Sequence, residues 1–494
     1  MEYFINHNLY LLSDQQSENV INYKSPHELS EELDEIKKKF KGTLKNSHSN
    51  LISLFKFIYQ NSVKTQSNNF LNQLYSNCHY LPLLGDLLAT HLNTSPYTYE
   101  VAPLFSVMEL DLAKTLRELF SLDLKSDFIT TPGASYGNMM GHYLARELKK
   151  IQIGHQKSDD LILYTPLSHY SVEHSRRILG FDQSQMVSIP MNDEYQIEVS
   201  SLDVMIKSLL SRKKKIKLIH LTLGTTVLGS FDSIRSILEL KEKYKLDVWI
   251  HVDAALGGSV IFSTKDDQIK YLDGLSEVDS FAWNLHKLPG SSGAPLQSSL
   301  LIVKDGSNLK KVNSLKSGYL YAEDKYYLTE YDMGDKYAQC GRRNDILKAW
   351  LLLTFCQDDI RKAFANMKSY HNLLSCYYQL DPRVHMISIS PLIINFWYIP
   401  KSMREYSFED ILKYKKDLLT EYTNEIKSVL VKELDKPILI AVQAAVNPVT
   451  MEKMPKSFRL IGSNNFGGYQ DVMCLVKTII EVGDQIDQKK LKNK

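Results

Sequence analysis

The stretches Asp247-Val-Trp-Ile-His-Val-Asp253-Ala-Ala-Leu-Gly-Gly258 and Ser280-Phe-Ala-Trp-Asn284-Leu-His286-Lys287 decide the fold. The first is apolar and β-branched from Val248 to Val252, which predicts a buried strand that ends on a carboxylate before a Gly-Gly break. The second has the same character, and we expect that strand to end on Lys287. In open α/β sheets the carboxyl ends of neighbouring strands face one crevice, so Asp253 and Lys287 are predicted to share a site.

A buried lysine amine beside a carboxylate is the pair that a pyridoxal phosphate enzyme requires. The amine forms a Schiff base with the cofactor aldehyde, and burial lowers its pKa. The carboxylate holds the proton of the pyridine nitrogen, which makes the ring an electron sink. The plainer interpretation is an Asp at a strand end and a surface Lys, but the matches elsewhere in the chain favour cofactor binding.

The segments His251-Val-Asp253-Ala-Ala and Asn284-Leu-His286-Lys287 resemble the group II pyridoxal phosphate-dependent amino-acid decarboxylases, most of all the cysteine-sulfinate and glutamate decarboxylases. The resemblance covers the chain from about Tyr23 to about Val482. It implies an α/β fold of the PLP-dependent transferase-like class (fold type I), with a mostly parallel, seven-stranded-type sheet in the large domain and a smaller α/β C-terminal domain. It also implies a homodimer with the active site at the subunit interface.

The length of 494 residues predicts one large domain with smaller flanking ones. We expect an N-terminal helical segment over residues 1–95, a large cofactor-binding domain over 96–365 and a small domain over 366–494. Within the first of these, Ser25 is the expected N-cap of a helix with Pro26 at its first position. A formal net charge of +2 provides no field for gathering nucleic acid, which points to a small-molecule partner.

Five scattered cysteines, odd in number and without metal-ligand spacing, predict neither a disulfide framework nor a metal site. The longest apolar runs fall short of the ~18 residues that cross a bilayer, and the N-terminus lacks a basic signal region. We therefore expect no membrane association and a cytoplasmic location.

The turn Thr130-Thr-Pro-Gly133-Ala-Ser135-Tyr136-Gly137-Asn138 opens a predicted helix. Free N–H groups at a helix start bind anions, so Ser135, Tyr136 and Gly137 are candidates for holding the cofactor phosphate. The resembling family usually has Gly-Gly-Ser-x-Ser-Asn here, whereas this chain has Ala134 and Gly137. One hydroxyl ligand is therefore lost.

Further cofactor contacts are implied by the resemblance. His169, after the apolar strand 161–164, matches a family histidine that stacks on the pyridine ring and serves catalysis. Thr225, in the turn after strand 217–222, matches a threonine that touches the cofactor, and Asn284 and His286 belong to the lysine motif. Two departures surround Lys287: Leu285 replaces the usual proline, which predicts a less rigid strand end, and the loop 288–299 is about three residues longer.

Substrate contacts are implied at Gln73, Tyr97 and Arg459. Gln73 matches a glutamine that contacts the distal acidic group, and the form Thr94-Ser95-Pro-Tyr97 is closer to cysteine-sulfinate decarboxylases than to glutamate decarboxylases. Alternation in the strand 456–464 turns Arg459 to the side opposite Phe458 and Leu460, and an inward arginine is costly unless it meets an anion.

The aromatic-rich segment 317–332 lacks helical or strand periodicity, which is typical of an active-site lid. Tyr327 matches the family's loop tyrosine, the proton donor to the carbanion carbon. The following segment 334–345 repeats another family signature, in which Arg342 is the residue most expected to frame the site.

These observations predict α-decarboxylation of a small acidic L-amino acid, with cysteine sulfinate or aspartate favoured. Glutamate decarboxylation to 4-aminobutyrate is one alternative, and a cofactor-binding protein that has lost turnover is another. Decarboxylation of aromatic amino acids is disfavoured, because the charge of Arg459 would lie unpaired against an aromatic ring.

Overall fold

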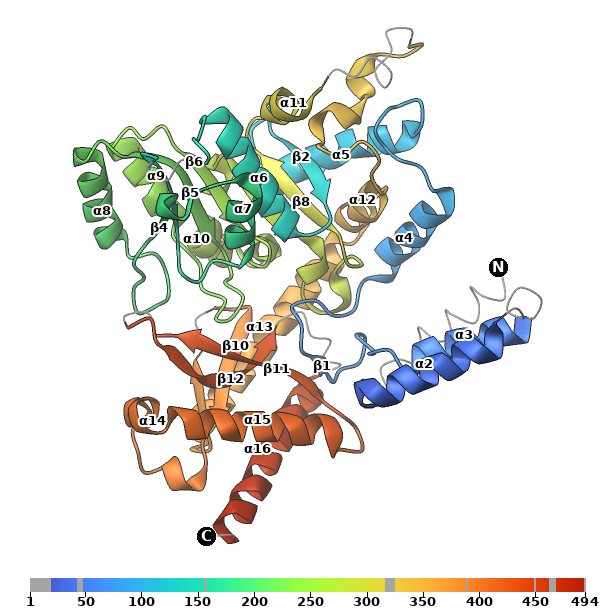
Figure 1. The fold of residues 1–494 in the computed structure, drawn as a ribbon, viewed down its shortest axis with the longest axis vertical. Coiled ribbons are helices and arrows are strands. Elements are labelled where there is room, and N and C mark those ends of the chain that lie inside the picture. The colour runs from blue at the N-terminus through green and yellow to red at the C-terminus, as the bar shows by residue number, and fades with distance from the viewer. Residues whose placement is uncertain are drawn as a thin grey trace.

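The fold consists of a large α/β domain and a smaller one stacked against it (Figure 1). The computed structural model describes residues 19–41, 48–154, 158–315, 325–387, 390–447, 450–461 and 468–492. The first part of the predicted lid, 317–324, and the end of the strand expected over 456–464 lie outside these ranges.

The large domain is built on a seven-stranded sheet of order β2-β8-β7-β6-β5-β3-β4. Its strands are β2 (Asp127–Thr131), β3 (Asp160–Tyr164), β4 (Met186–Ser188), β5 (Lys215–Thr222), β6 (Trp249–Asp253), β7 (Ser280–Asn284) and β8 (Ser299–Val303). Only β8 runs antiparallel to its neighbours, β2 and β7. The predicted mostly parallel sheet of seven strands is confirmed.

Helices cover the faces of this sheet, as parallel strands require. They are α5 (Pro103–Phe120), α6 (Ala134–Leu148), α7 (Ser171–Leu179), α8 (Val199–Ser211), α9 (Ile234–Lys243), α10 (Lys265–Leu272), α11 (Ser307–Asn313) and α12 (Ile346–Phe355). Every residue of β6, β7 and β8 is buried, which explains why these strands are continuous apolar runs rather than alternating ones.

The N-terminal part projects from the body as two helices, α2 (Pro26–Phe40) and α3 (His48–Gln60) (Figure 1). Ser25 caps α2 as predicted. In a capping box with Glu28, each of these two side chains accepts the backbone N–H of the other residue. After α3 the chain forms a two-residue strand, β1 (Phe70–Leu71), and then α4 (Tyr80–Leu92), which packs on α12.

The small domain has a five-stranded sheet of order β1-β11-β12-β10-β9. Its strands besides β1 are β9 (Val384–Ile387), β10 (Ile393–Tyr398), β11 (Leu439–Val446) and β12 (Lys453–Ile461), and its helices are α13 (Gln357–Leu380), α14 (Phe408–Tyr414), α15 (Lys416–Lys432) and α16 (Tyr469–Lys492). Helices α15 and α16 lie on the side of the sheet away from the large domain (Figure 1). The other side faces the carboxyl ends of the large sheet.

Two features cross the predicted domain limits. Strand β1 pairs in parallel with β11, so residues before 96 complete the sheet of the small domain. Helix α13 runs through the position expected to separate the large and small domains. None of the helices within the described ranges is long and apolar enough to cross a membrane.

Candidate active site

Asp253 and Lys287 meet at the carboxyl edge of the large sheet. Asp253 is the last residue of β6 and is paired with Ala282 of β7. Its Oδ1 accepts the N–H of Ala255 at 3.0 Å, and its Oδ2 accepts Nδ2 of Asn138 at 2.7 Å. Strand β7 ends at Asn284, so the expectation of a strand ending on Lys287 is wrong. The lysine lies instead on a single 3-10 turn, Leu285–Lys287.

The Lys287 amine is held between two opposite influences. Burial lowers its pKa, the positive charge of Arg459 lowers it further, and the carboxylate of Asp253 opposes them without reversing the shift. A lysine with a lowered pKa has a larger neutral fraction and is a better nucleophile at neutral pH. The arrangement suits an amine that must attack an aldehyde.

His169 lies in the loop between β3 and α7, where both Asp253 and Lys287 influence its pKa. Burial lowers the pKa of His169, the Lys287 charge lowers it too, and Asp253 acts in the opposite direction. Its Nδ1 accepts the backbone N–H of Ser171 at 3.2 Å. The ring is therefore a neutral imidazole at neutral pH.

The start of α6 is tied to the lysine motif. Oδ1 of Asn284 accepts the N–H of Ala134 at 2.9 Å, which fixes the first turn of the helix against the end of β7. Ser135 is exposed in that turn, and Tyr136 is half-buried. A Cβ added to Gly137 would come within 3.0 Å of Cβ of Ala282. The missing serine at position 137 therefore coincides with a close approach of helix and strand.

The two departures around Lys287 are coupled to each other. Leu285 is fully buried, and its N–H donates to the carbonyl of Ser298 at 2.9 Å, while the N–H of Ala294 donates to the carbonyl of Leu285 at 3.1 Å. A proline at 285 has no N–H to donate. Ser298 precedes Ser299, the antiparallel partner of Asn284, so a leucine at 285 extends the pairing of β7 and β8 by one hydrogen bond that a proline could not make.

Arg459 reaches this edge from the small domain. It is 2% exposed, and its Nη1 donates to the carbonyl of Thr226 at 2.6 Å and to Oε1 of Gln443 at 2.9 Å. Burial lowers its pKa to about 10, so it stays charged at neutral pH. Among the described residues its Nε has no hydrogen-bond partner, and burial alone, with no neighbouring carboxylate, accounts for the shift in its pKa. The predicted inward orientation is confirmed.

Thr225 lies in the same turn as the Arg459 contact. Its hydroxyl is 2.8 Å from that of Ser230 and accepts the N–H of Ser230 at 3.0 Å, so it closes the turn. His286 contacts the loop after Lys287: its Nδ1 donates to the carbonyl of Ser298 at 3.0 Å. Burial, together with the Lys287 charge, lowers the pKa of His286 to about 4.

The stretch with Tyr97 is anchored by Arg342. Its N–H donates to the Ser95 hydroxyl at 3.0 Å, and its Nη2 donates to the carbonyl of Pro96 and to Oε2 of Glu109. Glu109 is fully buried and also pairs with Lys336 at 3.0 Å. Although burial opposes ionisation, these two cations hold the pKa of Glu109 below its usual value. Arg342 therefore frames this stretch as a buried anchor.

Tyr327 contacts the residues that follow Tyr97, at Tyr99 and Glu100. The hydroxyl of Tyr327 donates to Oδ1 of Asp332 at 2.9 Å, and its ring is 4.9 Å from that of Tyr99. Gln73 follows β1 and is exposed in the single chain. Among the described residues, no hydrogen bond or ring contact joins Tyr327 or Gln73 to Lys287.

The residues fit pyridoxal phosphate by their chemistry. Lys287 offers an amine of lowered pKa, Asp253 a carboxylate with both oxygens fixed, and α6 a helix start with an exposed Ser135. The family model for the pyridoxal-dependent decarboxylase conserved domain matches residues 27–394. The chain belongs to this decarboxylase family. Its cofactor is pyridoxal phosphate, and the enzyme is a carboxy-lyase.

Relatives of this pyridoxal-dependent decarboxylase include the human cysteine sulfinic acid decarboxylase, 34% identical over 403 residues that cover 78% of each chain. The acidic amino acid decarboxylase GADL1 of Xenopus tropicalis is 34% identical over 369 residues, or 72% of this chain and 70% of that one. The crystal structure of mouse CSAD superposes with a TM-score of 0.85 at 27% identity over 98% of both chains. The resemblance expected from the lysine and aspartate motifs is confirmed.

Sequence reasoning about the decarboxylase missed two residues that touch the predicted site. Asn138 was quoted only within the phosphate turn, yet its side chain holds Asp253. Gln443 was not singled out, yet it holds Arg459. A signal was present for Asn138, because an amide four residues into a helix that must face the sheet requires a buried partner. For Gln443 the signal is the pairing of β11 with β12, in which Ala441 lies opposite Arg459 and Gln443 is two residues further along β11. Only the structure provides this register.

Proposed function

We propose that this enzyme removes the α-carboxyl group of a small acidic L-amino acid, with cysteine sulfinate or aspartate preferred to glutamate. The observation that carries the proposal is the buried guanidinium of Arg459, which lacks an anionic partner within the described chain. A buried unpaired charge is costly, so the site is built for an anion that arrives with the substrate. The names of the human and frog relatives agree with an acidic substrate.

The proposed roles follow the positions of the side chains. When bound, pyridoxal phosphate supplies an electron sink for the bond that breaks. Lys287 would hold the cofactor aldehyde, and Asp253 would hold the proton on the pyridine nitrogen. His169 would stack on the ring, Ser135, Tyr136, Gly137 and Thr225 would hold the phosphate, and Asn284 and His286 would frame Lys287.

Substrate recognition is assigned to the opposite side of the site. Arg459 and Gln73 hold the side-chain acid, and Tyr97 adds a hydroxyl near it. One observation supports the role of Gln73: it follows β1 by two residues, and β1 pairs with β11, the strand that carries Gln443. A planar guanidinium binds carboxylates and sulfinates by two parallel hydrogen bonds.

The substrate preference is tested by a side-by-side assay of amine release at equal concentrations. We expect cysteine sulfinate or aspartate to react faster than glutamate, by a graded factor of about 10-fold to 200-fold, since one methylene is worth about 1–3 kcal/mol. Aromatic amino acids should be inert. A clear preference for glutamate would refute the substrate assignment, and absence of turnover with every acid would favour a protein that binds cofactor without catalysis.

Tyr327 is assigned the protonation of the substrate carbon. Replacement by phenylalanine removes the hydroxyl and keeps the ring that contacts Tyr99. Carbon dioxide release should continue, while the aldehyde and the aminated cofactor accumulate as side products. The measurement is the ratio of amine to carbon dioxide, with Tyr326→Phe as control because Tyr326 is 79% exposed. A ratio of one in Tyr327→Phe would exclude this role.

A homodimer with the active site at the subunit interface is proposed from the outer faces of α4 and α5. These neighbouring helices, both packed on α12, expose several apolar residues, among them Leu84, Leu87, Leu88, Leu104 and Val107, each at least 44% accessible. Apolar side chains gathered in this way mark interaction surfaces. In addition, Tyr327 makes its described contacts away from Lys287, which fits a site completed by a second subunit.

Sedimentation of the native protein should give twice the chain mass. The double variant Leu87→Glu/Leu104→Glu should sediment as a monomer, while Leu124→Glu, at a position 89% exposed outside the patch, should remain dimeric. A native monomer would contradict the proposal.

A cytoplasmic location is proposed as well, in accord with five cysteines that form no disulfide.

A further inference from the structure

A run of buried polar groups continues from Asp253 into the large domain. Nδ2 of Asn138 lies 2.7 Å from Oδ2 of Asp253, and Oδ1 of Asn138 lies 3.0 Å from Nε2 of His251. On the other side of that ring, Nδ1 lies 2.8 Å from Oγ of Ser280, which is 2.9 Å from Nε1 of Trp249. All five side chains are at most 4% exposed. They connect α6, β6 and β7.

The chemistry of these groups allows one arrangement of hydrogens. The Trp249 indole can only donate, so Ser280 accepts from it and turns its own hydroxyl hydrogen to His251. At the other end the carboxylate of Asp253 only accepts, so the amide of Asn138 donates to it and presents its oxygen to His251. The imidazole must then carry its hydrogen on Nε2 and leave Nδ1 free to accept. Every donor faces an acceptor.

The charge state of His251 agrees with this arrangement. Burial holds the pKa of His251 well below its usual value, and the neighbouring rings of His142 and His220 lower it further. The ring is therefore neutral and carries a single N–H, as the run of hydrogen bonds requires.

We propose that Trp249, Ser280, His251 and Asn138 form a directional hydrogen-bond chain that orients the Asp253 carboxylate toward the pyridine nitrogen of the cofactor. Asn138 and the backbone N–H of Ala255 each occupy one oxygen of Asp253, which fixes the plane of the carboxylate. The four side chains are positioning residues, because they act through Asp253 and do not touch the cofactor. The inference concerns cofactor binding and does not depend on the proposed substrate.

The packing around His251 fixes the position of its ring beside Asn138. Helix α6 approaches β6 at Gly141, where an added Cβ would lie 2.3 Å from Nδ1 of His251. Real Cβ atoms do not approach so closely, so any larger residue at 141 must displace the ring. Asn138 is fixed in turn by a second contact from its Nδ2 to Oγ of Ser171 at 3.0 Å.

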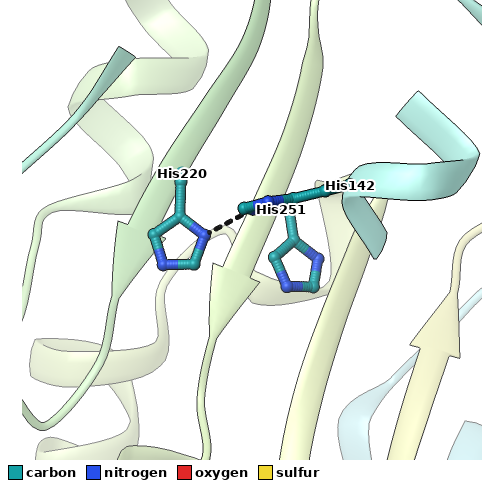
Figure 2. Close-up of side chains that lie close together, drawn as sticks. All are labelled: His142, His220 and His251. Carbon is teal, nitrogen blue, oxygen red and sulfur yellow. Dashed lines mark hydrogen bonds between the residues drawn. The ribbon is translucent and has the colours of Figure 1, made fainter. Parts of the chain in front are cut away.

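A metal ion is the competing explanation for the histidines at this place. Figure 2 shows His142, His220 and His251 side by side, with nitrogen atoms that lie within 4.8 Å of one another. However, Nε2 of His142 is already hydrogen-bonded to Nδ1 of His220 at 2.9 Å, and both nitrogens of His251 serve the chain to Asp253. Coordination by His251 would break that chain, so the observed hydrogen bonds favour positioning over metal binding.

The test uses the holoenzyme reconstituted with pyridoxal phosphate carrying ¹⁵N at the ring, without substrate. Asn138→Leu keeps the volume of the side chain but cannot hydrogen-bond. We expect cofactor affinity to fall by about 10–100-fold, as for other partners that orient a ligand, and the ¹⁵N resonance to move toward that of unprotonated pyridine. The matched control is His142→Gln, which alters the same buried cluster outside the chain and should leave both quantities within twofold.

A folded Asn138→Leu protein whose ¹⁵N resonance and affinity stay within twofold of the parent would overturn the proposal. If that variant does not fold, Gly141→Ala takes its place, because it displaces His251 without removing any donor, and the same movement of the resonance is expected. Elemental analysis of the native protein decides the competing explanation. One metal ion per chain, whose removal by a chelator shifts the resonance, would assign the histidines to a metal site instead.

Discussion

Replacing Lys287 by alanine should abolish the cofactor's absorbance band near the visible edge and lower decarboxylation by about 10⁴-fold, the upper end of what one positioned group contributes. The reason is the role proposed for Lys287: burial lowers the pKa of its amine, which favours attack on the cofactor aldehyde. In the native protein the band should disappear on reduction with borohydride, because reduction fixes the covalent link to Lys287.

The control for this experiment is Lys265→Ala, at an exposed lysine that begins α10, between the aspartate and lysine motifs. It should keep the reducible band and full activity. Mass spectrometry of the reduced native protein provides an independent check, with the cofactor expected on the peptide that contains Lys287. An equal reducible band in Lys287→Ala would mean that another lysine holds the cofactor.

Replacing Asp253 by asparagine should weaken cofactor binding and lower activity by about 10³-fold, which corresponds to about 4 kcal/mol of transition-state stabilisation. A neutral amide cannot hold the proton of the pyridine nitrogen, so the ring loses its strength as an electron sink. In either orientation of the new amide, its NH2 group faces a donor, Nδ2 of Asn138 or the N–H of Ala255, where the structure has hydrogen bonds of 2.7 Å and 3.0 Å.

The matched control is Asp232→Asn, which changes another buried aspartate of the large domain. Asp232 accepts the N–H groups of Thr222 and Ile197, and burial raises its pKa to about 7. That variant should stay within tenfold of native activity. Steady-state kinetics and equilibrium dialysis of the cofactor measure both variants, and activity of Asp253→Asn within tenfold of native would remove Asp253 from the assigned role.

Much of the fold could be predicted because its central strands carry strong local signals. Strands β6 and β7 are continuous apolar runs, and α2 begins at a Ser-Pro pair that caps and starts a helix. The inward orientation of Arg459 follows from simple alternation along β12. In each case the signal lies within a few neighbouring residues, so it can be recognised without knowledge of tertiary contacts.

The rest depended on contacts between distant segments. Strand β7 stops at Asn284 although the next residue, Leu285, is apolar, because the chain turns there into the 3-10 turn Leu285–Lys287. The two residues of β1 show no periodicity of their own and are a strand only through their pairing with β11. The role of Asn138 likewise requires its distance to Asp253, which no local pattern encodes.

The pairing of Phe70 with Leu439 has a consequence for the order in which the protein is made. Residues 70–71 leave the ribosome early, whereas β11 is synthesised only after the whole large domain. Strand β1 therefore cannot pair until β11 has been made, and it must wait unpaired during most of translation. Such non-local pairing is slow and leaves an open strand edge in the nascent chain, which makes the ribosome-bound intermediate a natural client for chaperones.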